Sequence, residues 1–86
     1  MLTKTVIVQI PSEQMNTIIT FFIKKANEFT SQVTVARGED RVNAKSLLGL
    51  LSMRLERGTE LILSAEGSDA AEALASLTKV LEQPAA

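Results

Sequence analysis

The amino-acid sequence predicts an α+β domain in which helices cover one face of a sheet. Apolar residues near the start of the chain recur at every second position, as in a strand with one buried face. Two later segments repeat them every three or four residues, as in an amphipathic helix. The predicted order is β-α-β-β-α-β-α, and this mixed order with a hairpin fits an α+β domain better than an all-parallel sheet. A chain of 86 residues builds one core, so we expect a single domain over residues 1–86.

A first strand and a first helix occupy the N-terminal third of the chain. The strand has apolar residues at even spacing, and we expect it to end at Pro11-Ser12. These residues are Leu2, Val6, Val8 and Ile10. The helical stripe that follows consists of Met15, Ile18, Ile19, Phe22, Ile23, Ala26 and Phe29. Ser12 or Asn16 can cap this helix. Because Met15 continues the stripe, we expect an early start that is capped at Ser12, with Met15 packed inward.

A hairpin and a short helix are predicted in the middle of the chain. Residues 33–35 form a strand, residues 38–40 a turn and residues 41–43 the return strand. Residues 46–55 are rich in helix-forming leucine and begin with a serine, which is a favourable N-cap. We therefore expect a helix over this segment, closed by Arg57-Gly58.

The C-terminal part adds a strand and a helix. Residues 60–66 form the predicted strand, and Gly67 forms a turn after which Ser68-Asp69 begins the last helix. The apolar stripe of this helix is Ala70, Ala73, Leu74, Leu77, Val80 and Leu81. We expect residues 83–86 to fray.

Charge and aromatic content argue against direct binding of nucleic acid. Nine Lys and Arg side chains oppose ten Asp and Glu side chains, for a net charge of −1, whereas a nucleic-acid binder usually has a basic excess. Aromatic residues make up only 3% of the chain, so bases would find few stacking platforms. The apolar runs are far shorter than the ~20 residues that span a bilayer and too short for a signal-peptide core. We therefore expect a cytoplasmic protein that does not contact a membrane.

The chain contains neither histidine nor cysteine. These absences remove the side chain most often used for proton transfer near neutral pH, the thiolate nucleophile and the usual zinc ligands. We accordingly expect no enzyme activity, no metal ion and no cofactor.

Residues 47–55 hold more apolar side chains than one helix face can bury. Such side chains fill six of these nine positions, whereas a short surface helix hides only about half of its circumference. One interpretation is a helix that is buried on most sides, or scattered apolar exposure of no consequence. The other is a partner-binding patch formed by Leu47, Leu48 and Leu51.

Ser46 also has two interpretations. As a serine before an apolar run it is an N-cap. As a phosphorylation site it would place the added negative charge at a helix N-terminus, next to Lys45.

Four segments carry a resemblance to a known family. They are residues 26–33 (ANEFTSQV), 42–53 (VNAKSLLGLLSM), 58–61 (GTEL) and 65–74 (AEGSDAAEAL). Together they resemble HPr, the phosphocarrier family of the bacterial sugar phosphotransferase system. The resemblance extends over the chain without a gap. It implies an HPr-like open-faced sandwich, with a four-stranded antiparallel sheet and three helices on one face.

The segment that carries the chemistry of HPr departs from the family. HPr carries its phosphoryl group on a histidine before the first helix, and arginine and proline follow it. In this chain Met15 stands where the histidine should be, Thr17 replaces the arginine and Ile18 replaces the proline. A thioether is not suited to accept the phosphoryl group. The chain is therefore similar to a histidine-lacking subgroup of HPr-like proteins of catabolite repression, which keeps a regulatory serine.

The resemblance to that subgroup implies a regulatory role. Ser46 would be phosphorylated by an HPr kinase/phosphorylase, and the phosphorylated protein would act as corepressor with a LacI-type transcriptional regulator. The leucines Leu47, Leu48 and Leu51, with Lys45 beside them, would contact these partners. Family members also use the arginine that Thr17 replaces in the regulator interface. The alternative is a degenerate HPr-fold interaction domain with neither histidine nor serine phosphorylation.

Overall fold

Strands and helices follow one another in the predicted order in the computed structural model, which describes residues 1–82. The fraying predicted for residues 83–86 lies outside these described residues. The elements are β1 (Leu2–Ile7), the 3₁₀ turn η1 (Ser12–Gln14), α1 (Met15–Ala26), β2 (Gln32–Arg37), β3 (Asp40–Asn43), α2 (Leu47–Ser52), β4 (Glu60–Glu66) and α3 (Ala70–Glu82).

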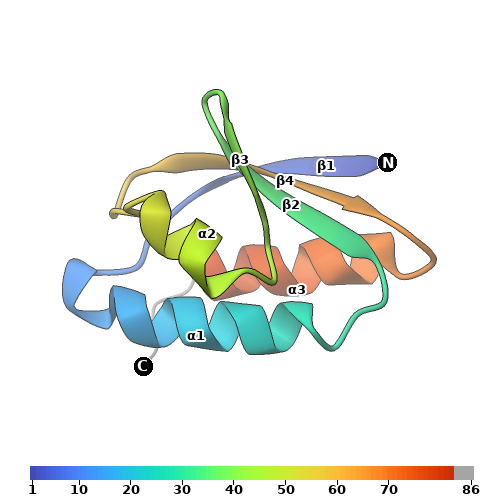
Figure 1. Ribbon diagram of the computed structural model, residues 1–86, viewed down its shortest axis with the longest axis horizontal. Helices are drawn as coiled ribbons and strands as arrows, with labels where there is room; N and C mark the ends of the chain where they lie inside the picture. Colours follow the sequence, from blue (N-terminus) through green and yellow to red (C-terminus); the bar gives the residue numbers. More distant parts are fainter. Residues whose placement is uncertain (83–86) are drawn as a thin grey trace.

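The four strands form one sheet in the order β1-β4-β2-β3, and every neighbouring pair is antiparallel. The three α-helices lie under one face of this sheet, with α1 and α3 side by side and α2 beneath β3 (Figure 1). The α+β class and the open-faced sandwich that the resemblance implies are both confirmed. The hairpin turns at Gly38-Glu39, since β3 already begins at Asp40.

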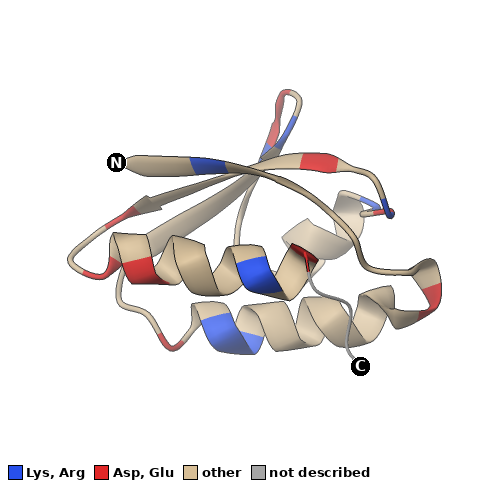
Figure 2. Cartoon of the chain, turned by 180° about the vertical axis from the view of Figure 1, so that it is seen from behind, with Lys and Arg blue, Asp and Glu red and all other residues tan. Residues whose placement is uncertain are grey.

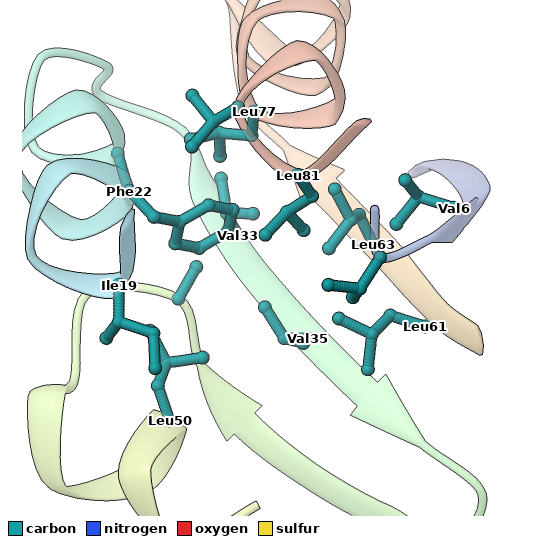
Figure 3. Packing of buried hydrophobic residues seen from close by; sticks show 14 of the residues in the cluster. Val6, Ile19, Phe22, Val33, Val35, Leu50, Leu61, Leu63, Leu77 and Leu81 are labelled. Atoms are coloured by element: carbon teal, nitrogen blue, oxygen red, sulfur yellow. The ribbon is translucent and has the colours of Figure 1, made fainter. Parts of the chain in front are cut away.

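The core lies between the sheet and the helices. On β4 the side chains of Leu61, Leu63 and Ala65 point to the helices and are buried, whereas Ile62 between them is exposed, as the two-residue period of a strand requires. Phe22 of α1 reaches toward the sheet in this layer (Figure 3). All six predicted stripe residues of α3 are buried. Removal of this apolar surface from water is the main contribution to stability.

The first strand is shorter than predicted, since β1 ends at Ile7 and not at Ile10. Val8 and Ile10 are fully buried, so their apolar spacing was a correct indication of burial but not of strand structure. The backbone bonds of this stretch are Val8 N to Thr59 O (2.9 Å), Gly58 N to Val8 O (2.7 Å) and Gln9 N to Leu81 O (2.9 Å). The chain therefore leaves the sheet by bonding to the loop before β4 and to the end of α3.

The start of the first helix is partly as predicted. Helical winding begins at Ser12, but as a 3₁₀ turn, and the α-helix begins at Met15. The predicted cap by Ser12 is wrong, because Pro11 holds the extended N-cap position and the Gln14 amide donates to the Pro11 carbonyl at 3.0 Å. The α1 helix ends at Ala26, so Phe29 packs against the core from the following loop.

The short helix is also shorter than the predicted segment 46–55. It ends at Ser52, and Arg54 adopts a left-handed conformation with φ of +51°. This turn carries Met53 and Leu55 into the core, where both are buried. The apolar residues after Ser52 were thus correctly expected to pack, but they pack from a loop.

Asp69 joins the loop between β4 and α3 to the loop between α1 and β2. Its carboxylate accepts hydrogen bonds from the backbone amides of Thr30 and Ser31, both at 2.9 Å, and from the Ser31 hydroxyl. The Ser31 hydroxyl and then the Thr30 amide lower the pKa of Asp69 from 3.8 to about 2, because they stabilise the charged form. Gly67 packs against the same serine, since a Cβ there would lie 2.7 Å from Ser31 Cα. We call these four residues the Asp69 latch.

Candidate functional site

Ser46 is the N-cap of α2, as predicted. Its backbone is extended, with φ of −100° and ψ of 110°, and its Oγ accepts a hydrogen bond from the Gly49 amide at 3.1 Å. Its carbonyl accepts from Leu50 N at 3.1 Å, which is the first bond of the helix. Gly49 fits closely here, because a Cβ at this position would lie 3.0 Å from Val42 Cβ and 3.1 Å from Ser46 Oγ. The Ser46 side chain is therefore held in place by the Gly49 amide, and it is only half-buried.

The leucines of α2 divide between the core and solvent. Leu50 is 1% exposed and points toward Ile19 of α1, with which it lines a small apolar cavity (Figure 3). The other three leucines are exposed: Leu47 by 50%, Leu48 by 80% and Leu51 by 44%. A helix buried on most sides is therefore wrong, whereas scattered apolar exposure and a partner-binding patch both agree with these exposures. We call Leu47, Leu48 and Leu51 the leucine patch, because residues three and four positions apart are neighbours on a helix surface.

Lys45 lies directly before the cap, but its ammonium is engaged elsewhere. Its Nζ donates to the Phe29 carbonyl at 3.0 Å, and its backbone amide donates to Asn43 Oδ1 at 2.8 Å. The side chain thus connects the loop after α1 to the approach to α2. To reach a phosphate on Ser46, the ammonium would have to leave the Phe29 carbonyl.

Met15, which the resemblance predicts at the family's phosphohistidine position, is the first residue of α1. Its side chain is 6% exposed and belongs to the hydrophobic core, as predicted. The neighbouring Thr17 is exposed and Ile18 is buried. Within residues 1–82, the buried Gln14 Oε1 has no hydrogen-bond partner. Met15 is therefore an inward apolar side chain that offers solvent no nucleophile.

Sequence reasoning missed a contact that holds the other end of α2. Arg37, the last residue of β2, donates from Nη1 to the carbonyl oxygens of Met53 and Arg54, the latter at 3.2 Å. The left-handed backbone of Arg54 costs about 1 kcal/mol relative to an ordinary conformation. Only a signal for the left-handed turn could have indicated this contact, and arginine carries no such signal.

Charges are interspersed over the chain. Seen from behind, short segments of both charges are scattered over a ribbon that is mostly uncharged (Figure 2). The net charge of the whole chain is −1. In the part of the chain that the structure describes, no helix is long and apolar enough to cross a membrane. The leucine patch is accordingly the surface feature that most needs an explanation.

Comparison with known proteins identifies relatives of this arrangement. The family model described as "PTS HPr component phosphorylation site" matches residues 2–83. The chain is 42% identical over 62 residues to the HPr-like protein Crh of Bacillus subtilis (strain 168). The aligned residues cover 72% of this chain and 73% of Crh. The chain is 38% identical over 60 residues to the phosphocarrier protein HPr of Neisseria meningitidis (serogroup A, strain Z2491), covering 70% and 67% of the two chains.

Solved structures agree with this assignment. The HPr structure from Bacillus anthracis str. Ames superposes with a TM-score of 0.89 at 30% identity, over 93% of this chain and 95% of that one. A crystal structure of Bacillus subtilis Crh, described as a swapped, intertwined dimer, gives a TM-score of 0.73 at 33% identity, over 91% and 85%. The family model, the sequence relatives and the common fold together show that this chain belongs to the HPr family.

Proposed function

We propose that this chain is a regulatory HPr-family protein of carbon catabolite repression that does not transfer phosphate through histidine and is switched by phosphorylation at Ser46. The observation that carries this proposal is the juxtaposition of the capping Ser46 with three exposed leucines of the same short helix. Its partners would be an HPr kinase/phosphorylase and a LacI-type transcriptional regulator, and it would act in the cytoplasm as one HPr-like unit over residues 1–86.

The composition of the first helix supports the absence of phosphocarrier activity. The chain has no histidine, and Met15 at the corresponding position is buried. Thr17 supplies neither the charge nor the planar donors that an arginine directs at a phosphate. Incubation with phosphoenolpyruvate and the first enzyme of the phosphotransferase system should leave the intact mass unchanged. An acid-labile gain of one phosphate would contradict this part of the proposal.

The geometry at Ser46 is compatible with a switch that changes binding and preserves the fold. Phosphorylation adds about −1.5 to −2 charges at neutral pH. The Oγ atom would remain next to the Gly49 amide, and that amide is one of the first-turn donors without an intrahelical partner. The leucine patch would supply most of the affinity for a partner, and the phosphate would supply the on/off control.

Treatment with purified HPr kinase/phosphorylase and ATP tests the proposal. We expect one phosphate by intact mass, located at Ser46, and no labelling of Ser46→Ala. Ser52→Ala is the matched control, because Ser52 lies in the same helix and its hydroxyl donates only to the Gly49 carbonyl, at 2.7 Å, among residues 1–82. Equal labelling of wild type and Ser46→Ala would place the modification elsewhere.

Binding of the phosphorylated protein to a LacI-type regulator is the second test. We expect binding only after phosphorylation, and Leu47→Ala or Leu51→Ala should weaken it by about 1–3 kcal/mol if either residue is an anchor. Because both side chains are about half exposed, the free energy of unfolding should change little.

The alternative is an HPr-fold interaction domain with neither histidine nor serine phosphorylation. The exposed leucine patch favours it as well, because an apolar surface binds a partner without phosphate. If purified kinase leaves Ser46 unmodified while the folded protein still binds a partner through the leucines, the alternative holds and Ser46 is only a cap.

A further inference from the structure

A residue outside α2 holds its C-terminal end. Arg37 ends β2, and its guanidinium donates to the carbonyls of Met53 and Arg54. Met53 is the C-cap of α2, and the last carbonyls of a helix have no intrahelical donor, whereas Arg54 is the first residue beyond the cap. A half-buried arginine with donors in a planar fork is well suited to bind two successive carbonyls.

The leucine patch is not held in place by its own burial. Within α2 only Leu50 is buried, and the helix has six residues, too few to be stable in isolation. At its N-terminal end the Ser46 cap orients the first turn. At its C-terminal end the last amide bonds are long: Met53 N to Leu50 O is 3.2 Å and Arg54 N to Leu51 O is 3.3 Å. The last turn of α2, which carries Leu51, is therefore held by these long bonds and, just beyond it, by the contact of Arg37.

The conformation of Arg54 indicates that the contact with Arg37 stabilises the backbone here. Among residues 1–82, Arg54 is the only residue other than glycine with positive φ. An unfavourable backbone conformation persists only where surrounding contacts compensate for it. The bond from Arg37 to the Arg54 carbonyl is one such contact, and burial of Leu55 is the other.

We propose that Arg37 is a positioning residue for the leucine patch: it holds the last turn of α2 in the conformation to which the kinase and the regulator bind. This inference rests on the proposed function of the patch. It adds a residue from the sheet, distant in sequence, that acts on recognition through the helix it holds.

Hydrogen exchange tests the contact without any partner. In Arg37→Gln, protection of the Met53 and Arg54 amides should fall about fivefold, the factor that corresponds to one typical hydrogen bond. Amides of β4 should keep their protection. Arg41→Gln is the matched control, because Arg41 is exposed on the neighbouring strand and makes no hydrogen bond or ion pair within the described residues. Equal protection of the two amides in both variants would overturn the proposal.

Kinase kinetics test the consequence for recognition. For Arg37→Gln we expect KM for the protein substrate to rise about two- to fivefold with kcat unchanged, because a smaller fraction of molecules presents the patch correctly. Adding Arg54→Gly to this variant should restore KM in part, since glycine adopts positive φ without strain. Arg37→Lys should lie between wild type and Arg37→Gln. An arginine that touched the kinase directly would show no rescue by Arg54→Gly, and that result would overturn the proposal.

The two sets of measurements separate this inference from the proposed function. If wild-type protein is not phosphorylated, the proposed function fails, while hydrogen exchange still tests the contact of Arg37 with the end of α2. If wild-type protein is phosphorylated and Arg37→Gln has the KM of Arg41→Gln, the proposed function stands and the positioning role is wrong.

Discussion

The Asp69 latch and the α2 helix lie in different parts of the fold and use their side chains in opposite ways. At the latch, polar groups from two loops turn toward one another, and the carboxylate accepts from two amides and a hydroxyl. At α2, three of four leucines turn toward solvent. The polar groups of the latch bond to one another, whereas α2 exposes apolar surface that stability alone does not explain. This difference is the main reason to look for recognition at α2.

The two regions also differ in what holds them. The latch joins segments 38 and 39 residues apart in sequence through hydrogen bonds to one charged group. The α2 helix depends on a cap at one end, the buried Leu50 in its middle and Arg37 beyond its other end. Substitutions should therefore affect stability strongly at the latch, whereas at α2 their effect should depend on the side chain chosen.

The largest effect is expected from Gly67→Ala. The added Cβ would lie 2.7 Å from Ser31 Cα and 2.9 Å from Ser31 Cβ, and φ of +148° is unfavourable for any side chain. We expect a loss of about 3 kcal/mol in the free energy of unfolding, measured by urea denaturation. Gly38→Ala is the control: its φ is also positive, but nothing lies within 4 Å of the added Cβ. Equal losses in the two variants would show that backbone conformation alone matters.

Two leucines of α2 sharpen the comparison within one helix. Leu50→Ala should cost about 3 kcal/mol, because it leaves a cavity against α1. Leu48→Ala should change stability by less than about 0.5 kcal/mol, because that side chain is mostly in solvent. Thermal and urea denaturation check both values. A large loss for Leu48→Ala would mean that the leucine patch serves the fold.

The pH dependence of stability tests the latch. The folded-state pKa of Asp69 is lowered to about 2 from 3.8, so its contribution is fully present above about pH 4 and is lost as the pH falls from there through about 2. Asp69→Asn should be less stable than wild type at neutral pH, and the difference should shrink over this window. Urea denaturation between pH 2 and 5 measures it. A difference that stays constant over the window would mean that the charge of Asp69 contributes nothing.

A moderate effect is expected from loss of the cap of α2. Ser46→Ala removes the acceptor of the Gly49 amide and should cost about 1 kcal/mol. Ser46→Asp retains an acceptor and should keep most of this stability, as urea denaturation can show. If Ser46→Ala has wild-type stability, the hydroxyl is free for a regulatory role alone.

The sequence predicted the helices and strands that follow from the spacing of nearby apolar residues. Alternating residues indicated the strands, and the stripe from Ala70 to Leu81 indicated a helix that the structure contains. Met15 was expected inside because it continues the stripe of α1, and it is. The number of apolar side chains in residues 47–55 predicted that some α2 leucines are exposed, because a short helix cannot bury so many. In each case the period of the helix or strand decides which nearby residues share a face, and this spacing is visible in the sequence.

Tertiary structure decided which of several similar residues are buried and which groups they contact. Helical spacing grouped Leu48 with Leu47 and Leu51, but only the position of α1 makes Leu50 a core residue and leaves Leu48 on the surface. Val8 and Ile10 are buried like strand residues, yet the backbone of Val8 bonds to the loop before β4 and that of Gln9 bonds to Leu81 of α3. The contacts of Arg37 with Arg54, and of Asp69 with Ser31, join residues 17 and 38 positions apart. The period of an element relates only near neighbours, so pairings at such separations appear only when the packed sheet and helices bring the two ends together.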